Sequence, residues 1–546
     1  MINEINPVVR ELLKKRGVIS EEDILEFLSE KPQKTYNPFL LLNMEAGVDL
    51  ILSTIKTNGK ICIYGDYDAD GITSISIMME ILSNLTKNLE YYIPSRFDEG
   101  YGLNKKAIRE IKNGGTQLII TVDCGSVSCD EVDLAKELGM DIIITDHHNL
   151  NQKKPECLII NPKQDNCKYP FKGLAGCGVA FKLAQGLSEK AVLPKSVLSS
   201  LLDLVGIGTI GDIVPLIDEN RTLVKYGIRA INSTKRQGLI KLIKETGLKY
   251  GNVNSENVAY VIVPHINSAG RIAKAEIAVE LLISKDLKVQ TDAVTSLILL
   301  NKERKRLQEE TFLQCVSIVE ESYQDDNFKV IMSEDAHEGI AGIVAGKIKD
   351  KYERPTIIIT NSGEYLKGTG RSIKTIDLYK ILKGVEDIFE KFGGHFSACG
   401  FLMKKENIFT LREYLEKEVC RQYTENSQLF LIEKEPDYKF QGNEINTSLI
   451  YELEKLAPFG NSNEKPLFEI EDVTINRFSY MGIDNEYLRF NSECRDGSSF
   501  ACILFNDVEK FSCHFVNNKK VNIYGFPNIN VWNGTEKIQF VVSSIK

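Results

Sequence analysis

The sequence predicts an α/β protein: a parallel-sheet domain joined by long helices to a smaller α/β domain, with a β barrel after them. Three observations lead to this prediction. From about residue 55, short apolar runs alternate with amphipathic stretches, which is typical of βαβ units. Residues 276–322 keep a helical pattern with few Gly or Pro. After about residue 430, short β runs replace the helices, which favours a small closed barrel.

Length and composition limit the classes of protein to which the chain can belong. A chain of 546 residues is too long for one hydrophobic core, and 43% hydrophobic with 26% charged residues is ordinary for globular domains. The formal net charge of −9 argues against a protein that coats nucleic acid through bulk positive charge. Any contact with nucleic acid must therefore be local.

The cysteines and the apolar segments bear on the compartment. Twelve cysteines occur without a C-x-x-C pair, so neither a zinc ribbon nor a dense disulfide framework is indicated, and reduced thiols are expected. The first residues contain no apolar signal core, and no stretch approaches the ~18 apolar residues of a membrane span. We expect a cytoplasmic protein with no membrane association.

Residues 1–50 are expected to form a small helical lead-in. Ser20 and Asp23 have the spacing of a capping box in front of the apolar residues Ile24 and Leu25. We interpret this segment as packing.

Polar side chains follow three strands of the predicted parallel sheet, at the point where each strand ends. These strands and their polar residues are 60–64 with Asp66, Asp68 and Asp70, 117–122 with Asp123, and 140–145 with Asp146, His147 and His148. Ligands of open α/β sheets bind outside the carboxyl ends of the strands, so we expect the three clusters to meet in one crevice. A fourth acid, Asp212, follows a predicted buried helix over 197–210 and can reach the same crevice.

The first cluster has the composition of a cation site. Asp66, Asp68 and Asp70 alternate at a spacing of two, so on an extended backbone their carboxylates point to one side. Crowded negative charges require a cation; Mg²⁺ and Mn²⁺ favour oxygen ligands, and Mn²⁺ also accepts imidazole. Taken alone, the triplet also fits an acidic surface turn or a simple calcium-binding loop.

His147 and His148 favour the metal site over these alternatives. The chain has only six histidines, and two of them stand side by side at a predicted strand end. Carboxylates with one imidazole can hold a divalent ion that keeps positions open for water, which suits hydrolysis of a phosphate ester. We assign His147 to the metal and His148 to orienting or protonating groups around the phosphate.

At these residues the chain resembles the DHH phosphoesterases, and among them the RecJ branch of single-stranded-DNA exonucleases. GDYDADG at 65–71, VDCG at 122–125, DHH at 146–148 and GDIVPL at 211–216 look like the family's four metal motifs in order. The resemblance implies one or two Mn²⁺ or Mg²⁺ ions, with Asp123 bridging if two bind. The implied metal ligands are Asp68, Asp70, Asp123, His147 and Asp212, and the implied catalytic or supporting residues are Asp66, Asp146 and His148.

One position departs from more distant relatives, and another segment supports the exonuclease branch. In the pyrophosphatase relatives a metal-binding His stands upstream of the first acidic pair, and here Tyr64 occupies that place. The segment RFDEGYGL at 96–103, which contains Arg96, matches the exonuclease branch. The resemblance implies that it shapes the path of the DNA strand.

The second α/β unit contains two Gly-rich segments, GTGRS at 368–372 and GGHFSACG at 393–400. Either alone fits a plain turn, but both resemble substrate motifs of the DHHA1 domain, in which glycines bring backbone N–H groups close to phosphate and Arg supplies a bidentate charge. The segment at 267–271 also resembles a substrate-side motif. The implied substrate-binding residues are Arg96, Asn267, Arg271, Thr369, Arg371, Ser372, Gly394 and His395.

The chain beyond residue 430 distinguishes it from DHH relatives that act on dinucleotides or pyrophosphate, which end after the DHHA1-like unit. APFG at 457–460, followed by β-rich sequence, resembles the family's oligonucleotide-binding (OB) barrel. The family's usual PFGxGNP reads PFGNSNE here, with Ser462 and Glu464 at the changed places. Asn533 and Gly534 predict a hairpin turn.

Aromatic side chains of the barrel are candidates for stacking on DNA bases, with core packing as the alternative. They are Phe478, Tyr480, Tyr487 and Trp532.

We therefore expect five parts along the chain. They are a helical lead-in at 1–50, a DHH catalytic domain at 51–275, connecting helices at 276–325, a DHHA1 substrate-binding domain at 326–425 and an OB-like nucleic-acid-binding domain at 430–546.

The resemblance implies a metal-dependent 5′-to-3′ exonuclease that hydrolyses single-stranded DNA to 5′-mononucleotides in DNA repair and recombination. A phosphodiesterase for short RNA or cyclic dinucleotides is one alternative, although it would need neither the barrel nor the lead-in. A catalytically silent replication scaffold is another, although the acids and histidines are intact. Single-stranded DNA is the expected partner, with a repair helicase and a single-strand-binding protein as implied protein partners. Nothing in the sequence predicts an oligomer, so we expect a monomer.

Overall fold

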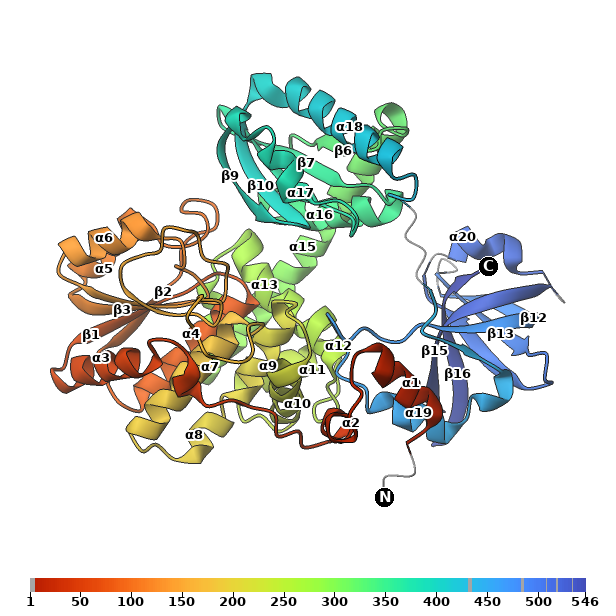
Figure 1. The fold of residues 1–546 in the computed structure, drawn as a ribbon, viewed down its shortest axis with the longest axis horizontal. Helices are drawn as coiled ribbons and strands as arrows, with labels where there is room; N and C mark the ends of the chain where they lie inside the picture. The colour runs from red at the N-terminus through yellow and green to blue at the C-terminus, as the bar shows by residue number, and fades with distance from the viewer. Residues whose placement is uncertain (1–4, 431–434, 483–485, 507, 517–518, 533) are drawn as a thin grey trace. The chain divides into compact units, whose positions relative to one another are not determined.

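A computed structural model describes the chain except for residues 1–4, 431–434, 483–485, 507, 517–518 and 533 and the side chain of Trp532. The chain divides into two compact units, here called the first and second units (Figure 1). The first contains residues 1–263, 282–287 and 434–546, and the second contains residues 264–281 and 288–433. The predicted turn residue Asn533 and the proposed stacking side chain of Trp532 lie outside the described part of the chain.

The first unit contains a five-stranded parallel sheet in the order β2-β1-β3-β4-β5, which confirms the predicted parallel sheet. Its strands are β1 (Lys60–Tyr64), β2 (Leu89–Tyr92), β3 (Thr116–Val122), β4 (Asp141–Thr145) and β5 (Leu158–Ile160). The central strands are apolar almost throughout because helices cover both faces of the sheet.

Helices α5 and α6 lie on one face of this sheet, and α3, α4 and α7 lie on the other (Figure 1). Helix α4 is buried on nearly all sides, which explains why its sequence has no continuous polar face. The helices of this region are α3 (Met44–Lys56), α4 (Ala69–Ser83), α5 (Lys105–Asn113), α6 (Cys129–Glu137), α7 (Gly176–Lys190), α8 (Lys195–Ser199), α9 (Leu202–Gly211), α10 (Asp218–Asn232), α11 (Gln237–Glu245), α12 (Ser255–Asn257) and a π-helical turn (Val258–Ile262).

The N-terminal lead-in begins with α1 (Pro7–Lys15) and α2 (Glu21–Leu28), followed by a 3₁₀ turn (Pro38–Leu40). Ser20 caps α2 by accepting the backbone N–H of Asp23, as the sequence predicts. The buried apolar residues of α1 and α2 belong to the same hydrophobic core as the C-terminal barrel. Helices α1 and α2 therefore pack on the barrel, whereas the 3₁₀ turn that follows them contacts α7.

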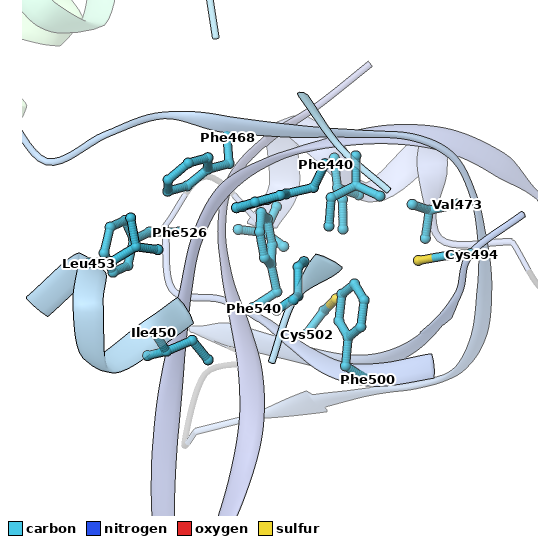
Figure 2. Close-up of a cluster of buried hydrophobic side chains, with 14 of the residues drawn as sticks. Phe440, Ile450, Leu453, Phe468, Val473, Cys494, Phe500, Cys502, Phe526 and Phe540 are labelled. Carbon is cyan, nitrogen blue, oxygen red and sulfur yellow. The ribbon is translucent and has the colours of Figure 1, made fainter. Parts of the chain in front are cut away.

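The C-terminal strands form the predicted barrel, in the order β11-β12-β13-β14-β16-β15, and pairing of β12 with β15 closes it. Figure 2 shows aromatic rings of its core, where Phe440 and Phe468 stack with centroids 4.5 Å apart. Its elements are β11 (Tyr438–Phe440), a 3₁₀ turn (Gly442–Glu444), α19 (Thr447–Glu454), β12 (Phe468–Met481), β13 (Tyr487–Glu493), β14 (Ser499–Leu504), α20 (Val508–Phe511), a 3₁₀ turn (Ser512–His514), β15 (Lys520–Trp532) and β16 (Thr535–Ile545).

The second unit contains a five-stranded sheet in the order β6-β7-β8-β10-β9, in which only the β6–β7 pairing is parallel. The elements from α13 onward are α13 (Val263–Ile272), α14 (Glu276–Ile283), α15 (Leu287–Ser322), β6 (Lys329–Met332), α16 (Glu338–Tyr352), β7 (Thr356–Ser362), β8 (Tyr365–Arg371), α17 (Leu378–Lys383), a 3₁₀ turn (Glu386–Ile388), β9 (Phe389–His395), β10 (Ala398–Lys404), a 3₁₀ turn (Lys405–Asn407) and α18 (Ile408–Glu425). Among the described residues, no helix has both the length and the apolar composition that crossing a bilayer requires.

Candidate metal centre

The loops after β1, β3 and β4 bring acids and histidines together at the carboxyl edge of the parallel sheet, as the strand-end positions predict. The side chains form three overlapping groups whose potential ligand atoms lie within 4.8 Å of one another. The groups are Asp123 with Asp146, His147 and His148; Asp70 with His147 and Asp212; and Asp66 with Asp68 and Asp123. All eight predicted metal-site and supporting residues are therefore neighbours.

The loop after β1 does not continue as extended backbone through the acidic triplet, so the expected alternation of its side chains is wrong. Asp68 is the N-cap of α4, and its Oδ1 accepts the backbone N–H groups of Asp70 (3.0 Å) and Gly71 (3.1 Å). Asp70 therefore lies in the first helical turn. A carboxylate at this position satisfies N–H groups that have no partner within the helix. A Cβ on Gly71 would lie 2.5 Å from the carbonyl oxygen of Asp66, so glycine permits the tight loop.

Asp70 is held by the N-terminus of α7. Its Oδ2 accepts the backbone N–H of Gly176 (2.6 Å), and its Oδ1 accepts that of Cys177 (2.8 Å). A Cβ on Gly176 would lie only 2.6 Å from Oδ1 of Asp123. The start of α7 therefore packs against two of the acids, and only glycine leaves room for both.

Asp123 occupies the left-handed region of backbone conformation, with φ 60°. Asp tolerates this region better than most residues, but it is uncommon outside glycine. The conformation places Oδ1 of Asp123 3.1 Å from Nε2 of His147. Strain of this kind is frequent at functional sites.

Asp146 acts as a hydrogen-bond acceptor for its neighbours. Its Oδ1 accepts the backbone N–H groups of His147 (2.7 Å) and His148 (3.1 Å) and contacts Nδ1 of His148 (2.8 Å), and its Oδ2 accepts the N–H of Ser126 (2.8 Å). Burial raises the pKa of Asp146, but the hydrogen bond and charge of His148 outweigh it and lower the pKa below its usual range. Asp146 thus remains ionised and fixes His148.

Asp212 approaches the same point from a helix end. It is the C-cap of α9, and its Oδ2 lies 3.5 Å from Nε2 of His147. Nε2 of His147 also lies 3.9 Å from Oδ2 of Asp70. One imidazole nitrogen is therefore faced by carboxylates from three segments that are far apart in the sequence.

Four buried atoms in this cluster have no hydrogen-bond partner among the described residues. They are Asp66 Oδ1, Asp123 Oδ1, His147 Nε2 and Asp212 Oδ2; the 3.1 Å approach of His147 Nε2 to Asp123 Oδ1 lacks the geometry of a hydrogen bond. Buried polar atoms without a partner are costly and rare in folded proteins. Oxygen atoms and an imidazole nitrogen that face one another suit Mn²⁺ or Mg²⁺, so the residues fit a metal centre.

The crowding of buried carboxylates also shifts the pKa values of the cluster. Burial, with the charges of neighbouring acids, raises the pKa of Asp212 to about 9 and that of Asp70 to about 6. The same causes raise the pKa values of Asp123 and Asp66 well above their usual range. Burial, with the charge of His148, lowers the pKa of His147 to about 3, which keeps this imidazole neutral and able to act as a ligand.

Two residues that contact the cluster were not among the predicted site residues. The hydroxyl of Tyr101 lies 3.1 Å from the carbonyl oxygen of Asp123 and 3.1 Å from Nδ1 of His148. Nδ2 of Asn161 donates to the carbonyl oxygen of His148 at 2.9 Å. Asn161 directly follows β5, so the strand-end rule could have identified it. Tyr101 lies in the segment 96–103, which matched the family without yielding a role for this residue.

Arg96 and Tyr64 lie beside the cluster. The Arg96 guanidinium sits 5.0 Å from the centroid of the Tyr67 ring, and its charge opposes the rise in the pKa of Asp66. Tyr64, the position at which the resemblance led us to compare a histidine of pyrophosphatases, is fully buried, and its hydroxyl donates to the carbonyl oxygen of Gly102 at 2.9 Å. Tyr64 therefore serves the packing of the sheet.

In the second unit, two predicted arginines lie against the start of α16. Arg271 donates to the carbonyl oxygen of Gly339 at 3.0 Å. A Cβ on Gly342 would lie 2.8 Å from a terminal nitrogen of Arg371, so the two residues are in close contact. His337 caps α16 by accepting the N–H of Gly339 at 3.1 Å. Two cations thus gather at a helix N-terminus, a combination that favours anions.

The other predicted substrate residues of this unit lie on α13 and on neighbouring strands. Asn267 is on α13 and partly exposed, and Thr369 is on β8, two residues before Arg371. Ala398 of β10 pairs with both Arg371 and His395, so these two residues occupy one row of the sheet. The remaining two are Ser372, whose hydroxyl donates to the carbonyl oxygen of Ile376, and Gly394, which has φ 151°.

Family models match three regions of the chain. The DHH family N-terminal domain matches residues 60–209, the DHHA1 domain matches residues 325–420 and the RecJ OB domain matches residues 436–544. The predicted domain boundaries themselves remain predictions.

Curated relatives extend over nearly the whole chain. The single-stranded-DNA-specific exonuclease RecJ of Bacillus subtilis (strain 168) is 38% identical over 98% of this chain and 68% of its own length. The protein of the same name from Escherichia coli (strain K12) is 30% identical over 85% of this chain and 83% of its own length.

Solved structures agree with this similarity. RecJ from Thermus thermophilus in complex with Mn²⁺ superposes with a TM-score of 0.83 at 25% identity, covering 99% of this chain and 76% of that one. An exonuclease RecJ bound to manganese superposes with a TM-score of 0.61 at 31% identity, covering 70% of this chain and 95% of that one.

Proposed function

Because the chain belongs to the RecJ family of single-stranded-DNA-specific exonucleases, we propose that it hydrolyses single-stranded DNA from a free 5′ end and releases 5′-mononucleotides. The observation that supports this chemistry is the set of four buried atoms without partners among the described residues, on Asp66, Asp123, His147 and Asp212, in overlapping groups of acids and histidines at the carboxyl edge of the sheet. We also propose a role in DNA repair and recombination, in which single strands must be degraded.

The ligands that we propose for one or two Mn²⁺ or Mg²⁺ ions are Asp68, Asp70, Asp123, His147 and Asp212, with Asp123 as the bridging candidate. Bound ions of this kind lower the pKa of water and neutralise the phosphate charge. The N–H groups of Gly176 and Cys177 hold Asp70 in place. Asp66 lies beside this set, with Asp68 and Asp123, and is proposed to support it.

His148 is proposed to orient or protonate groups around the phosphate. Burial lowers its pKa, but the hydrogen bond and charge of Asp146 outweigh this and raise it, so the ring can carry a proton near neutral pH. The hydroxyl of Tyr101 and the carboxylate of Asp146 fix the ring, and its side chain is 34% exposed, open to a substrate.

Strand binding is proposed for residues outside the metal centre. Arg271, Arg371 and Arg96 would neutralise phosphates, with Asn267, Thr369, Ser372, Gly394 and His395 supporting the backbone. In the barrel, Tyr480 is 43% exposed and packs edge to face with Phe478, with ring centroids 6.3 Å apart. Such an exposed aromatic, together with Tyr487, can stack on bases of a single strand.

We propose that the protein works in the cytoplasm with protein partners that supply single strands. All twelve cysteines are unpaired, which agrees with a reducing cytoplasm. A repair helicase would supply single strands, and a single-strand-binding protein would present them. We propose that the enzyme acts as a monomer.

The test uses single-stranded DNA labelled at the 5′ or the 3′ end, duplex DNA and RNA, each incubated with the protein in Mn²⁺. We expect labelled mononucleotide to appear at once from the 5′-labelled single strand and late from the 3′-labelled one. Asp70→Asn should remove this activity, whereas Asp130→Ala, on the exposed face of α6, should retain it. Equal attack on duplex and single strands, preference for RNA, or full activity of Asp70→Asn would contradict the proposal.

A further inference from the structure

The segment between α19 and β12 of the barrel lies against the loop that carries Asp212. We call residues 455–463 the tether; both the tether and the loop belong to the first unit. The carbonyl oxygen of Asn461 accepts the N–H of Leu216 at 2.8 Å, and its Nδ2 donates to the carbonyl oxygen of Ile213 at 2.8 Å. A Cβ on Gly460 would lie 2.7 Å from Cδ1 of Leu216. Asn461 therefore holds the loop at two residues: Ile213, directly after Asp212, and Leu216.

The backbone that Asn461 holds is in an unfavourable conformation. Ile213 has φ 58°, which is a genuine outlier for a β-branched residue. Its side chain is 70% exposed, so packing of that side chain contributes little to keeping the conformation. Such conformations persist only where the surrounding structure enforces them. The hydrogen bond from Asn461 to the Ile213 carbonyl is a contact of this kind.

The tether is itself firmly anchored. The buried guanidinium of Arg221 on α10 donates to the carbonyl oxygens of Lys455 (3.1 Å), Leu456 (3.0 Å) and Ala457 (2.9 Å). Nδ2 of the buried Asn463 donates to the carbonyl oxygens of Leu456 (2.9 Å) and Pro458 (2.7 Å). These bonds fix the backbone of the tether, and with it the position of Asn461.

We propose that Asn461 is a positioning residue for Asp212, through which the tether of the barrel sets the geometry of the metal centre. The backbone N–H of Asp212 completes α9 by donating to Gly208, so helix geometry fixes its N-terminal side. On its C-terminal side, the chain direction depends on the strained Ile213, whose N–H donates to the carbonyl oxygen of Ile210 at 3.3 Å and whose carbonyl oxygen accepts the bond from Asn461. Groups that orient metal ligands in this way affect metal affinity although they never touch the ion.

The inference rests on the proposed role of Asp212 as a metal ligand, and Mn²⁺ binding tests it. Asn461→Ala removes the bond to Ile213 but keeps the backbone acceptor for Leu216. We expect Mn²⁺ binding, measured by titration calorimetry, to weaken about five- to tenfold. The melting temperature in EDTA should change little, while the rise in melting temperature that Mn²⁺ produces should shrink.

Two further variants sharpen the comparison. Asn461→Asp keeps the size of the side chain but loses the donor, so it should weaken Mn²⁺ binding at least as much as Asn461→Ala. Asn476→Ala is the matched control: Nδ2 of Asn476 also makes a hydrogen bond, to Glu493 at 3.2 Å within the barrel. Its removal should leave Mn²⁺ binding unchanged.

The outcomes separate this inference from the proposed function. If Asp212→Asn weakens Mn²⁺ binding but both Asn461 variants stay within twofold of the parent, the positioning role is wrong and the ligand set stands. If Asp212→Asn binds Mn²⁺ like the parent, the proposed ligand set fails. If Asn461→Ala unfolds in EDTA, Mn²⁺ binding of Asn461→Asp becomes the test. If both variants unfold, the role of Asn461 is purely structural and the inference is wrong.

Discussion

Metal-free protein should lose stability as the pH rises, because Asp212 takes up a proton when the chain folds. Burial and the charges of Asp70 and Asp68 raise the pKa of Asp212 from 3.8 to about 9. Between these two values the folded state keeps a proton that the unfolded state has released, so the free energy of unfolding falls with pH. One proton corresponds to about 1.4 kcal/mol per pH unit, or about 3 kcal/mol between pH 6 and pH 8.

The assay is thermal or urea denaturation at pH 6, 7 and 8 in EDTA, with Asp212→Asn as the comparison. Asparagine does not titrate, so the parent should lose about 3 kcal/mol relative to this variant across the range. With Mn²⁺ the trend should reverse: the ion binds ionised carboxylates, so the stabilisation that it provides should grow with pH. Identical pH dependence of parent and variant in EDTA would refute the reasoning.

Three further predictions concern single side chains. Gly176→Ala places a methyl group 2.6 Å from Oδ1 of Asp123, so Mn²⁺ affinity should fall about tenfold. Gly178→Ala in the same helix should bind Mn²⁺ like the parent. Equal Mn²⁺ titration curves for Gly176→Ala and the parent would contradict the prediction. Tyr101→Phe removes the hydroxyl that contacts His148, so steady-state kinetics should show kcat about tenfold lower with an unchanged KM for DNA. An unchanged kcat would exclude a role of the Tyr101 hydroxyl in orienting His148. Ser462→Gly should raise the free energy of unfolding in urea by about 0.5–1 kcal/mol, because Ser462 has φ 60°; a decrease would argue against strain there.

The loops of the metal centre could be predicted because they depend on local patterns. Strands β1, β3 and β4 are short, mostly apolar runs, and the polar residues after each must lie at the carboxyl edge once the sheet forms. This reasoning correctly brought Asp123 and His147 together across two strands. The same rule applied to β5 would have added Asn161.

Side-chain direction within those loops was not predictable in the same way. The spacing of Asp66, Asp68 and Asp70 suggested extended backbone, but Asp68 became a helix cap and Asp70 entered the helix. Helix capping competes with extended structure for the same residues, and the choice depends on what covers the helix start. Here α7 packs against the start of α4 and binds Asp70 through its N–H groups, although it is more than a hundred residues away along the chain.

By itself, the sequence determined three strands of the parallel sheet, the residue types of a metal centre and the resemblance to a nuclease family, since periodicity and motif spacing are local properties. Only the tertiary structure decided that Asp123 adopts a left-handed backbone, that α1 and α2 pack on the barrel and that Asn461 donates a hydrogen bond to the loop of Asp212. These contacts join segments up to hundreds of residues apart. They depend on how folded elements pack, which no local pattern encodes.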